Sequence, residues 1–182
     1  GDKDMPAAMK AKLGSGVVTN NIANYMLEHP DFIKVMIGSW TNPPFAASDG
    51  KRWEKALSNV PFFVHMVPFP SEMTQFADIV LPSTFNAAEG MGAVTGFGSM
   101  HAWTSLQQPT CDRIWDVKQE ENEVTWLLAE KLAKKGWPAL LNYYANEFAD
   151  PETGAKPTNE KEFQLITTKI ASAPCWLHGS KP

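Results

Sequence analysis

The chain has 182 residues, of which 43% are hydrophobic and 20% are charged, and its formal net charge is -4. A chain of this size can bury a core, so we expect a soluble globular fold. The acidic balance, with no basic cluster larger than Lys134 and Lys135, excludes a nucleic-acid-binding surface, which needs several converging cations. No apolar run reaches the ~20 residues of a membrane-spanning helix, and the first residues do not form a secretory leader. Because the chain begins with Gly1 and not Met, we expect a piece of a longer protein.

The cysteines and histidines do not form a metal-ligand pattern. Cys111 and Cys175 are too far apart for a C-x-x-C motif, and each is typical of a small buried hydrophobe. The histidines are scattered and include no pair that would face a metal from one helix: His29, His65, His101 and His178. We therefore expect no self-contained metal site, and the isolated chain should bind neither iron nor molybdenum.

Helical patterns alternate with short apolar runs in the first half of the chain. A helical pattern over residues 17–28 ends before Pro30, because the residue before a proline disfavours the helical conformation. A second helix is expected over residues 50–57, where Ser48 or Asp49 can cap its first turn.

Three short apolar segments are typical of buried strands, over residues 33–37, 62–67 and 79–81. A helical turn that Ser71 caps, and that ends at Phe76, separates the last two. Strands this apolar need both faces covered, which predicts parallel pairing with right-handed crossovers. The predicted fold class is therefore α/β: a Rossmann-like, three-layer domain with a parallel sheet, followed by C-terminal helices.

The second half combines a glycine-rich stretch with further helical patterns. Residues 89–99 contain four glycines and little periodicity, which predicts a long irregular loop. Helices are expected over residues 122–135, 138–148 and 160–170. The first should bury a stripe of Val124, Leu127, Leu128 and Leu132, and Gly136 should follow its end. The last should begin at Thr158 or Asn159. A turn is expected at residues 150–154, and the tail from Ala171 is expected to be loose or to be a stub that leads onward. We assign residues 1–136 to the Rossmann-like domain and residues 137–182 to a helical extension and tail.

Loops that follow parallel strands converge at one edge of the sheet, where ligands bind. Three loops qualify here: residues 38–49, 67–71 and 82–98. The first contains Ser39, Thr41 and Asn42 ahead of a helix, which suits a phosphate or a nucleotide sugar. The same composition also fits a polar turn without a ligand.

The carboxylates and serines of the chain indicate no catalytic centre. Asp78 directly precedes an apolar strand, and an unpaired carboxylate at such a position costs folding free energy. Its side chain should therefore either hold the loop geometry or reach a ligand. Glu72 and Glu89 could pair for acid–base work, but nothing in the sequence brings them together. No serine lies in a G-x-S-x-G elbow, so nucleophilic catalysis lacks support.

Two segments carry a more specific pattern. Residues 69–82, FPSEMTQFADIVLP, follow residues 42–49, NPPFAASD. They resemble the T-E-T-A-x-x-A-D-V-V-L-P and N-P-x-x-S-x-P-D motifs of the molybdopterin oxidoreductases, the dimethyl-sulfoxide-reductase superfamily. The resemblance covers roughly residues 32–136. It implies the third, Rossmann-like domain of a catalytic subunit, which holds one guanosine end of a bis(molybdopterin guanine dinucleotide) cofactor.

The resemblance also implies which residues contact the cofactor. The loop after the first strand would contact the dinucleotide, the end of the second strand would line the nucleotide, and Asp78 would support the far side. The implied contacts are Ser39, Trp40, Thr41, Asn42, Pro44, Met66, Val67, Pro68 and Asp78. No catalytic residue and no metal ligand is implied in this region.

The chain departs from the family pattern at three places. Trp40-Thr41 replaces the usual Gly-Gly before Asn-Pro. Glycine permits a close approach of the backbone to the diphosphate that tryptophan does not. The acidic residue usual after the second strand is Val67, so guanine recognition through that carboxylate is lost or moved elsewhere. Only Glu89-Gly90 remains of the E-K-x-G-T-F-x-N-x-E-G-R pattern. This divergence is most similar to the arsenate, polysulfide, thiosulfate and tetrathionate branch.

The family's iron–sulfur cysteines and metal-ligating residue lie upstream of this region and have no counterpart here. The resemblance therefore implies a fragment that alone holds no cofactor and catalyses nothing. Its parent would transfer oxygen or sulfur atoms in two-electron steps at molybdenum or tungsten, with an iron–sulfur subunit as electron partner. The other domains of the parent would be the fragment's nearest partners, in a bacterial or archaeal complex that is periplasmic or membrane-associated. The alternatives are a stand-alone Rossmann-like nucleotide-binding or regulatory module and a purely structural domain.

Overall fold

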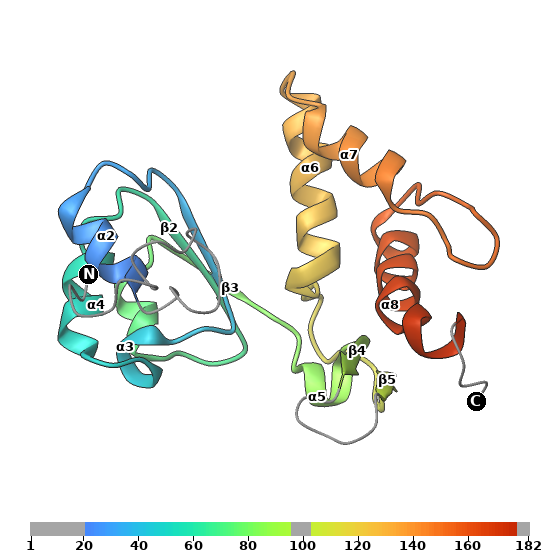
Figure 1. Ribbon diagram of the computed structural model, residues 1–182, viewed down its shortest axis with the longest axis horizontal. Coiled ribbons are helices and arrows are strands. Elements are labelled where there is room, and N and C mark those ends of the chain that lie inside the picture. Colours follow the sequence, from blue (N-terminus) through green and yellow to red (C-terminus); the bar gives the residue numbers. More distant parts are fainter. Residues whose placement is uncertain (1–20, 96–102, 178–182) are drawn as a thin grey trace. The chain divides into compact units, whose positions relative to one another are not determined.

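The computed structural model describes residues 21–95 and 103–177. The chain divides into two compact units, Gly1–Pro82 and Ser83–Pro182, and each is treated by itself below (Figure 1). The domain spans expected from the sequence, residues 1–136 and 137–182, stay predictions.

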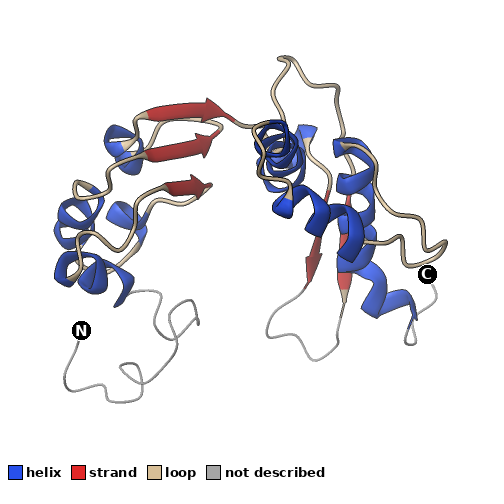
Figure 2. Cartoon of the chain, turned by 90° about the horizontal axis from the view of Figure 1, so that it is seen from above, coloured by secondary structure: helices blue, strands red, loops and turns tan. Residues whose placement is uncertain are grey.

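A three-stranded parallel sheet forms the centre of the first unit, in the order β1 (Met36–Ser39), β2 (Phe63–Val67) and β3 (Ile79–Pro82). The three arrows point the same way in Figure 2. The predicted α/β class and the parallel pairing are confirmed. β1 begins three residues later than residue 33, because Ile33 packs instead against the helices of this unit.

Over residues 21–82, four helical segments accompany the sheet: α2 (Ile22–Glu28), α3 (Pro43–Ala46), α4 (Gly50–Leu57) and the 3₁₀ helix η2 (Glu72–Phe76). The α4 bounds are those expected from the sequence. Asp49 rather than Ser48 caps α4, since its side chain accepts a hydrogen bond from Arg52 N at 3.2 Å. Of the helix expected over residues 17–28, residues 17–20 lie outside the described part of the chain.

Two apolar clusters hold the helices to the sheet. Ala23 and Met26 of α2 pack against Trp53 and Ala56 of α4. One residue further along α4, Leu57 joins a second cluster, which includes Phe63 of β2 and Met73 of η2. α4 therefore connects α2 to the sheet, and burial of its apolar face is the main term that stabilises this arrangement.

The expectation that every strand is covered on both faces is wrong for β3. Ile79, Val80 and Leu81 are 43%, 46% and 38% exposed, and Ile37 of β1 is also half-exposed. Exposure of such apolar side chains to water is unfavourable, and no other described residue covers them.

The second unit begins with α5 (Asn86–Glu89) and an antiparallel pair, β4 (Gly92–Thr95) and β5 (Thr104–Gln107). The pair corrects the prediction of an irregular loop over residues 89–99, of which residues 96–99 lie outside the described part. β4 is only four residues long, GAVT, which is too short for an apolar alternation to show among the neighbouring glycines.

Helices complete the second unit: the π-helical turn η3 (Glu120–Val124), α6 (Thr125–Lys134), α7 (Ala139–Glu147) and α8 (Glu160–Leu177). α6 buries Trp126 and Ala129, whereas Leu128 of the predicted stripe is exposed. Leu127 and Leu132 of the same stripe are half-buried, so the predicted stripe lies beside the buried face and not at its centre. The tail expected to be loose from Ala171 is wrong as far as Leu177, where α8 ends.

Three smaller expectations in this unit are confirmed. Gly136 follows α6 with a left-handed φ of 94°, as a residue after a helix end does. Asp150 accepts hydrogen bonds from Glu152 N and Thr153 N in the predicted turn. Asn159 Oδ1 accepts from two backbone N–H groups at the start of α8. Among the described residues, no helix combines the length and apolarity that crossing a bilayer requires.

Candidate functional site

The carboxyl ends of β1 and β2 bring two of the predicted loops together. Ser39 and Met66 are register partners, and Trp40 N donates to Met66 O at 3.1 Å just beyond the end of β1. Eight of the nine predicted contact residues, all except Asp78, lie at or beyond this edge of the sheet. The third predicted loop begins at Pro82 and continues into the second unit.

Met66 and Val67 are buried, so at the end of β2 it is Pro68 whose side chain reaches the surface.

Trp40 has a left-handed backbone conformation, with a φ of 50°. Residues other than glycine rarely adopt this conformation, which costs on the order of 1–2 kcal/mol. The backbone of this loop thus keeps the shape that a glycine would take, although the side chain is an indole. Strain of this kind persists where surrounding contacts hold the loop in place.

Asn42 supplies such a contact, because its side chain bridges the two loops. Its Nδ2 donates to Glu72 Oε2 at 2.5 Å, and its Oδ1 accepts from Met73 N at 3.1 Å. The bond from Asn42 is the main cause that lowers the pKa of Glu72 below its ordinary value, so the carboxylate is ionised at neutral pH. Both polar ends of Asn42 are therefore used within the protein.

His65 makes a second bridge beneath the first. Its fully buried ring has Nε2 at 3.1 Å from Thr41 O and Nδ1 at 3.0 Å from Thr74 Oγ1. A carbonyl oxygen only accepts, so Nε2 carries the proton and Nδ1 accepts from the Thr74 hydroxyl. Burial lowers the pKa of His65, against a smaller opposing effect of the Thr41 carbonyl, and the ring is neutral.

Thr74 completes this network, because its hydroxyl oxygen accepts from Ser71 N at 2.9 Å. Ser71 and Thr74 form a capping box at the start of η2, so the predicted capping role of Ser71 is confirmed. The sequence reading missed His65. The available signal was a polar residue at an inward position of an apolar strand, between Phe63 and Val67.

Residues of these two loops line an open depression of about 580 Å³: Asn42, Phe45, Phe69, Pro70, Ser71 and Glu72. At the same edge, Ser39 Oγ is buried and has no hydrogen-bond partner among the described residues. A buried hydroxyl without a partner is unfavourable unless a ligand or water bonds to it. A depression with aromatic, carboxylate and amide groups fits the nucleotide part of a dinucleotide cofactor.

Asp78 lies at the opposite edge of the sheet, at the amino end of β3. Its Oδ2 accepts from Phe63 N at 2.7 Å, and its own N–H donates to Phe63 O at 2.8 Å. The structure thus places Asp78 where it closes the start of the β2–β3 ladder. Glu89, in the second unit, accepts from Phe85 N and Ile114 N, and these bonds lower its pKa.

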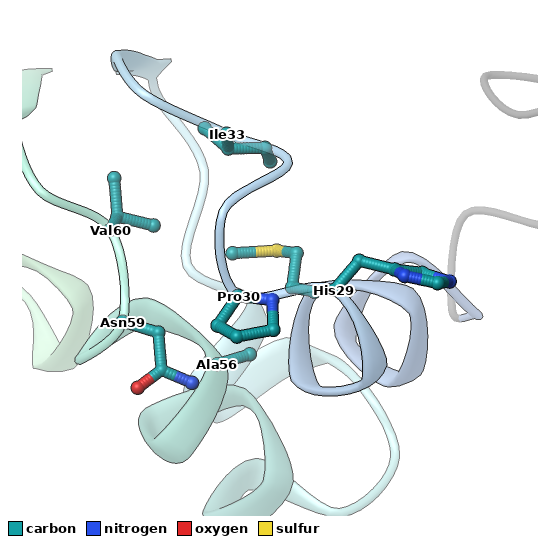
Figure 3. A pocket seen from close by; sticks show the side chains of 7 residues that line it. His29, Pro30, Ile33, Ala56, Asn59 and Val60 are labelled. Carbon is teal, nitrogen blue, oxygen red and sulfur yellow. The ribbon is translucent and has the colours of Figure 1, made fainter.

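A second hollow in the first unit lies between α2 and α4 (Figure 3). Apolar side chains of Met26, Ile33, Ala56 and Val60 line most of it, and the ring of His29 points away from Ala56 and Val60. It does not admit a water-sized sphere, so it is a packing gap.

The second unit contains a shallow depression of about 720 Å³ beside an ion pair of Arg113 and Glu123, whose side chains are 2.6 Å apart. Glu123 also accepts from Gln119 N, so its buried carboxylate is satisfied within the unit. Within the described residues, no group of three or more His, Cys, Asp or Glu side chains could hold a metal ion.

Comparison with known proteins identifies relatives over nearly the whole chain. It is 51% identical to the molybdopterin-containing subunit ArrA of the arsenate respiratory reductase of Chrysiogenes arsenatis, and 39% identical to that of Shewanella sp. (strain ANA-3), each over 97% of this chain. It is 30% identical over 70% of its length to the probable oxidoreductase YoaE of Bacillus subtilis (strain 168). The chain spans 21% of the length of either ArrA relative and 18% of YoaE. No family model matches.

Proposed function

We propose that this chain, which belongs to the molybdopterin oxidoreductases as a segment of their catalytic subunit, holds one guanosine end of a bis(molybdopterin guanine dinucleotide) cofactor. The observation that carries the proposal is the pair of bridged loops at the carboxyl edge of the parallel sheet, where Asn42 and His65 fix the loop after β1. Nucleotides bind at this edge in open parallel sheets.

The relatives imply a molybdopterin cofactor in the full-length protein. When bound, its metal supplies the two-electron atom-transfer chemistry. The residues of this chain would bind and orient the organic end: Ser39 Oγ would donate to a phosphate or sugar oxygen, and the left-handed backbone at Trp40 would keep the loop open to the diphosphate. The finer assignment, the guanine dinucleotide form, is part of the proposal.

The whole protein is proposed to reduce arsenate, because two relatives that match 97% of this chain are arsenate respiratory reductase subunits. The proposed partners are the remaining domains of the catalytic subunit and an iron–sulfur subunit that delivers electrons. Of the residues predicted to contact the cofactor, we retain the eight at the carboxyl edge, with backbone atoms only for the buried Met66 and Val67. We regard Asp78 as a residue that supports the sheet.

The substitution Asn42→Leu in the full-length protein tests this proposal. It removes the bonds to Glu72 and Met73, and so releases the loop that would contact the cofactor. Loss of two such bonds costs roughly 2–3 kcal/mol of loop stabilisation, and we expect a several-fold drop in molybdenum and guanine nucleotide per mole of purified protein.

The matched control is Asn59→Leu, at an exposed position after α4. It should retain the cofactor. Full cofactor content and activity in Asn42→Leu, with an unchanged unfolding temperature, would show that this loop does not hold the cofactor.

A further inference from the structure

The depression at the carboxyl edge combines two aromatic rings with a carboxylate. Phe45 of α3 and Phe69 of the loop after β2 line it and are 77% and 63% exposed. Glu72 lines it from the first turn of η2. Two exposed phenylalanines at one hollow are unfavourable in water, so they indicate a ligand with a flat apolar face.

The bridge from Asn42 also fixes the carboxylate. Because Asn42 Nδ2 donates to Glu72 Oε2, the side chain of Glu72 is held at the wall of the depression. An ionised carboxylate has about four acceptor positions and no donor. Asn42 and the backbone N–H of Glu72 use two of these positions. The remaining positions suit a ligand that presents adjacent N–H groups.

We propose that this depression binds the base of the nucleotide end, with guanine stacked against Phe45 and Phe69 and with its N1–H and N2–H groups donating to the Glu72 carboxylate. The inference rests on the proposed function and deepens it, because it assigns base recognition to residues outside the predicted contact set. It also provides a carboxylate at this edge of the sheet in a chain that has Val67, and no acidic residue, at the end of β2.

Selectivity follows from the chemistry of the base edges. Guanine presents two adjacent donors, which match the acceptors of one carboxylate. Adenine and cytosine each present a ring-nitrogen acceptor beside their amino group, so one lone pair would face the negative charge of Glu72. Mismatched acceptors disfavour the wrong ligand even when stacking is unchanged.

Variants of the full-length protein separate stacking from base recognition. Phe69→Ala and Phe45→Ala remove one ring each, and Phe32→Ala is the control, since Phe32 is an exposed phenylalanine before β1. Glu72→Gln keeps an oxygen that accepts from Asn42 but replaces the second acceptor by an amide donor.

Two quantities are measured: guanine nucleotide released by acid per mole of holoenzyme, and binding of GMP, AMP and CMP to cofactor-free full-length protein. We expect each Phe→Ala variant at the depression to bind GMP roughly tenfold more weakly and to hold less cofactor. Glu72→Gln should lose the preference for GMP over AMP and CMP while Phe32→Ala matches the wild type.

The outcomes distinguish the two proposals. If the wild-type holoenzyme releases no guanine nucleotide, the proposed function itself fails. If it releases guanine nucleotide but Phe69→Ala and Glu72→Gln match Phe32→Ala in cofactor content and in nucleotide binding, the base lies elsewhere, and only the present inference is overturned.

Discussion

His65 and Asn42 show how single side chains position a loop. Each contacts residues that are distant in sequence, since His65 reaches Thr41 and Asn42 reaches Glu72. Partners separated by 24 and 30 positions leave no local pattern, so neither bridge could be predicted from the sequence. The apolar run that contains His65 could be recognised as a strand, but the role of its one imidazole depends on how the loop after β1 folds back.

The buried imidazole predicts a pH dependence of stability. His65 has a lowered pKa in the folded protein, from an ordinary value of 6.5, because burial disfavours its charged form. The unfolded state therefore binds more protons below about pH 6.5, so this contribution is full above that pH and is lost as the pH falls toward the folded pKa. We expect the unfolding temperature to fall between pH 7 and 5.

The substitution His65→Gln tests the origin of that fall. A glutamine retains an N–H donor for the Thr41 carbonyl but does not titrate, so the fall between pH 7 and 5 should become smaller. Equal pH profiles for the wild type and His65→Gln would assign the acid sensitivity to other groups.

The helices and strands were predicted correctly where a clear run of apolar side chains packs into the core. They were predicted incorrectly where that pattern is weak. α4 and β2 were predicted nearly to the residue, because each presents a run of apolar side chains to one core cluster. β4 was missed because its four residues lie within a glycine-containing stretch whose composition indicates a loop. The buried face of α6 was misassigned because Trp126 and Ala129, and not the leucines of the predicted stripe, are the residues that it buries.

A close contact between α3 and α4 gives a prediction at the level of these elements. A Cβ atom at Gly50 would lie 2.1 Å from Pro44 O, which is a backbone atom, so the backbone itself would have to shift. Gly50→Ala should therefore displace α3, which carries Phe45, and lower cofactor content in the full-length protein together with the unfolding temperature. Gly92→Ala is the control, because its Cβ would meet no atom within 4 Å. Unchanged cofactor content in Gly50→Ala would show that the position of α3 does not matter for binding.

The molecule as a whole displays apolar surface on a sheet that an independent protein would be expected to cover. The exposed side chains, each more than a third exposed, are those of Ile37, Ile79, Val80 and Leu81. The chain matches only about a fifth of the length of its ArrA relatives. We therefore expect other parts of the full-length protein to cover these strands. Fold class was predictable from the strands alone, whereas this incomplete burial was not, because apolar composition does not reveal which chain segment covers a face.

Val80→Asp distinguishes a covered β3 from an exposed one. In the isolated chain Val80 is 46% exposed, so a carboxylate at this position stays hydrated, and the unfolding temperature should change little. In the full-length protein the same carboxylate would be buried without a partner, at a cost of about 3 kcal/mol or more, and yield and cofactor content should fall. The measurement compares thermal unfolding of both forms with and without the substitution. Equal, small effects in the two forms would show that β3 remains exposed in the full-length protein.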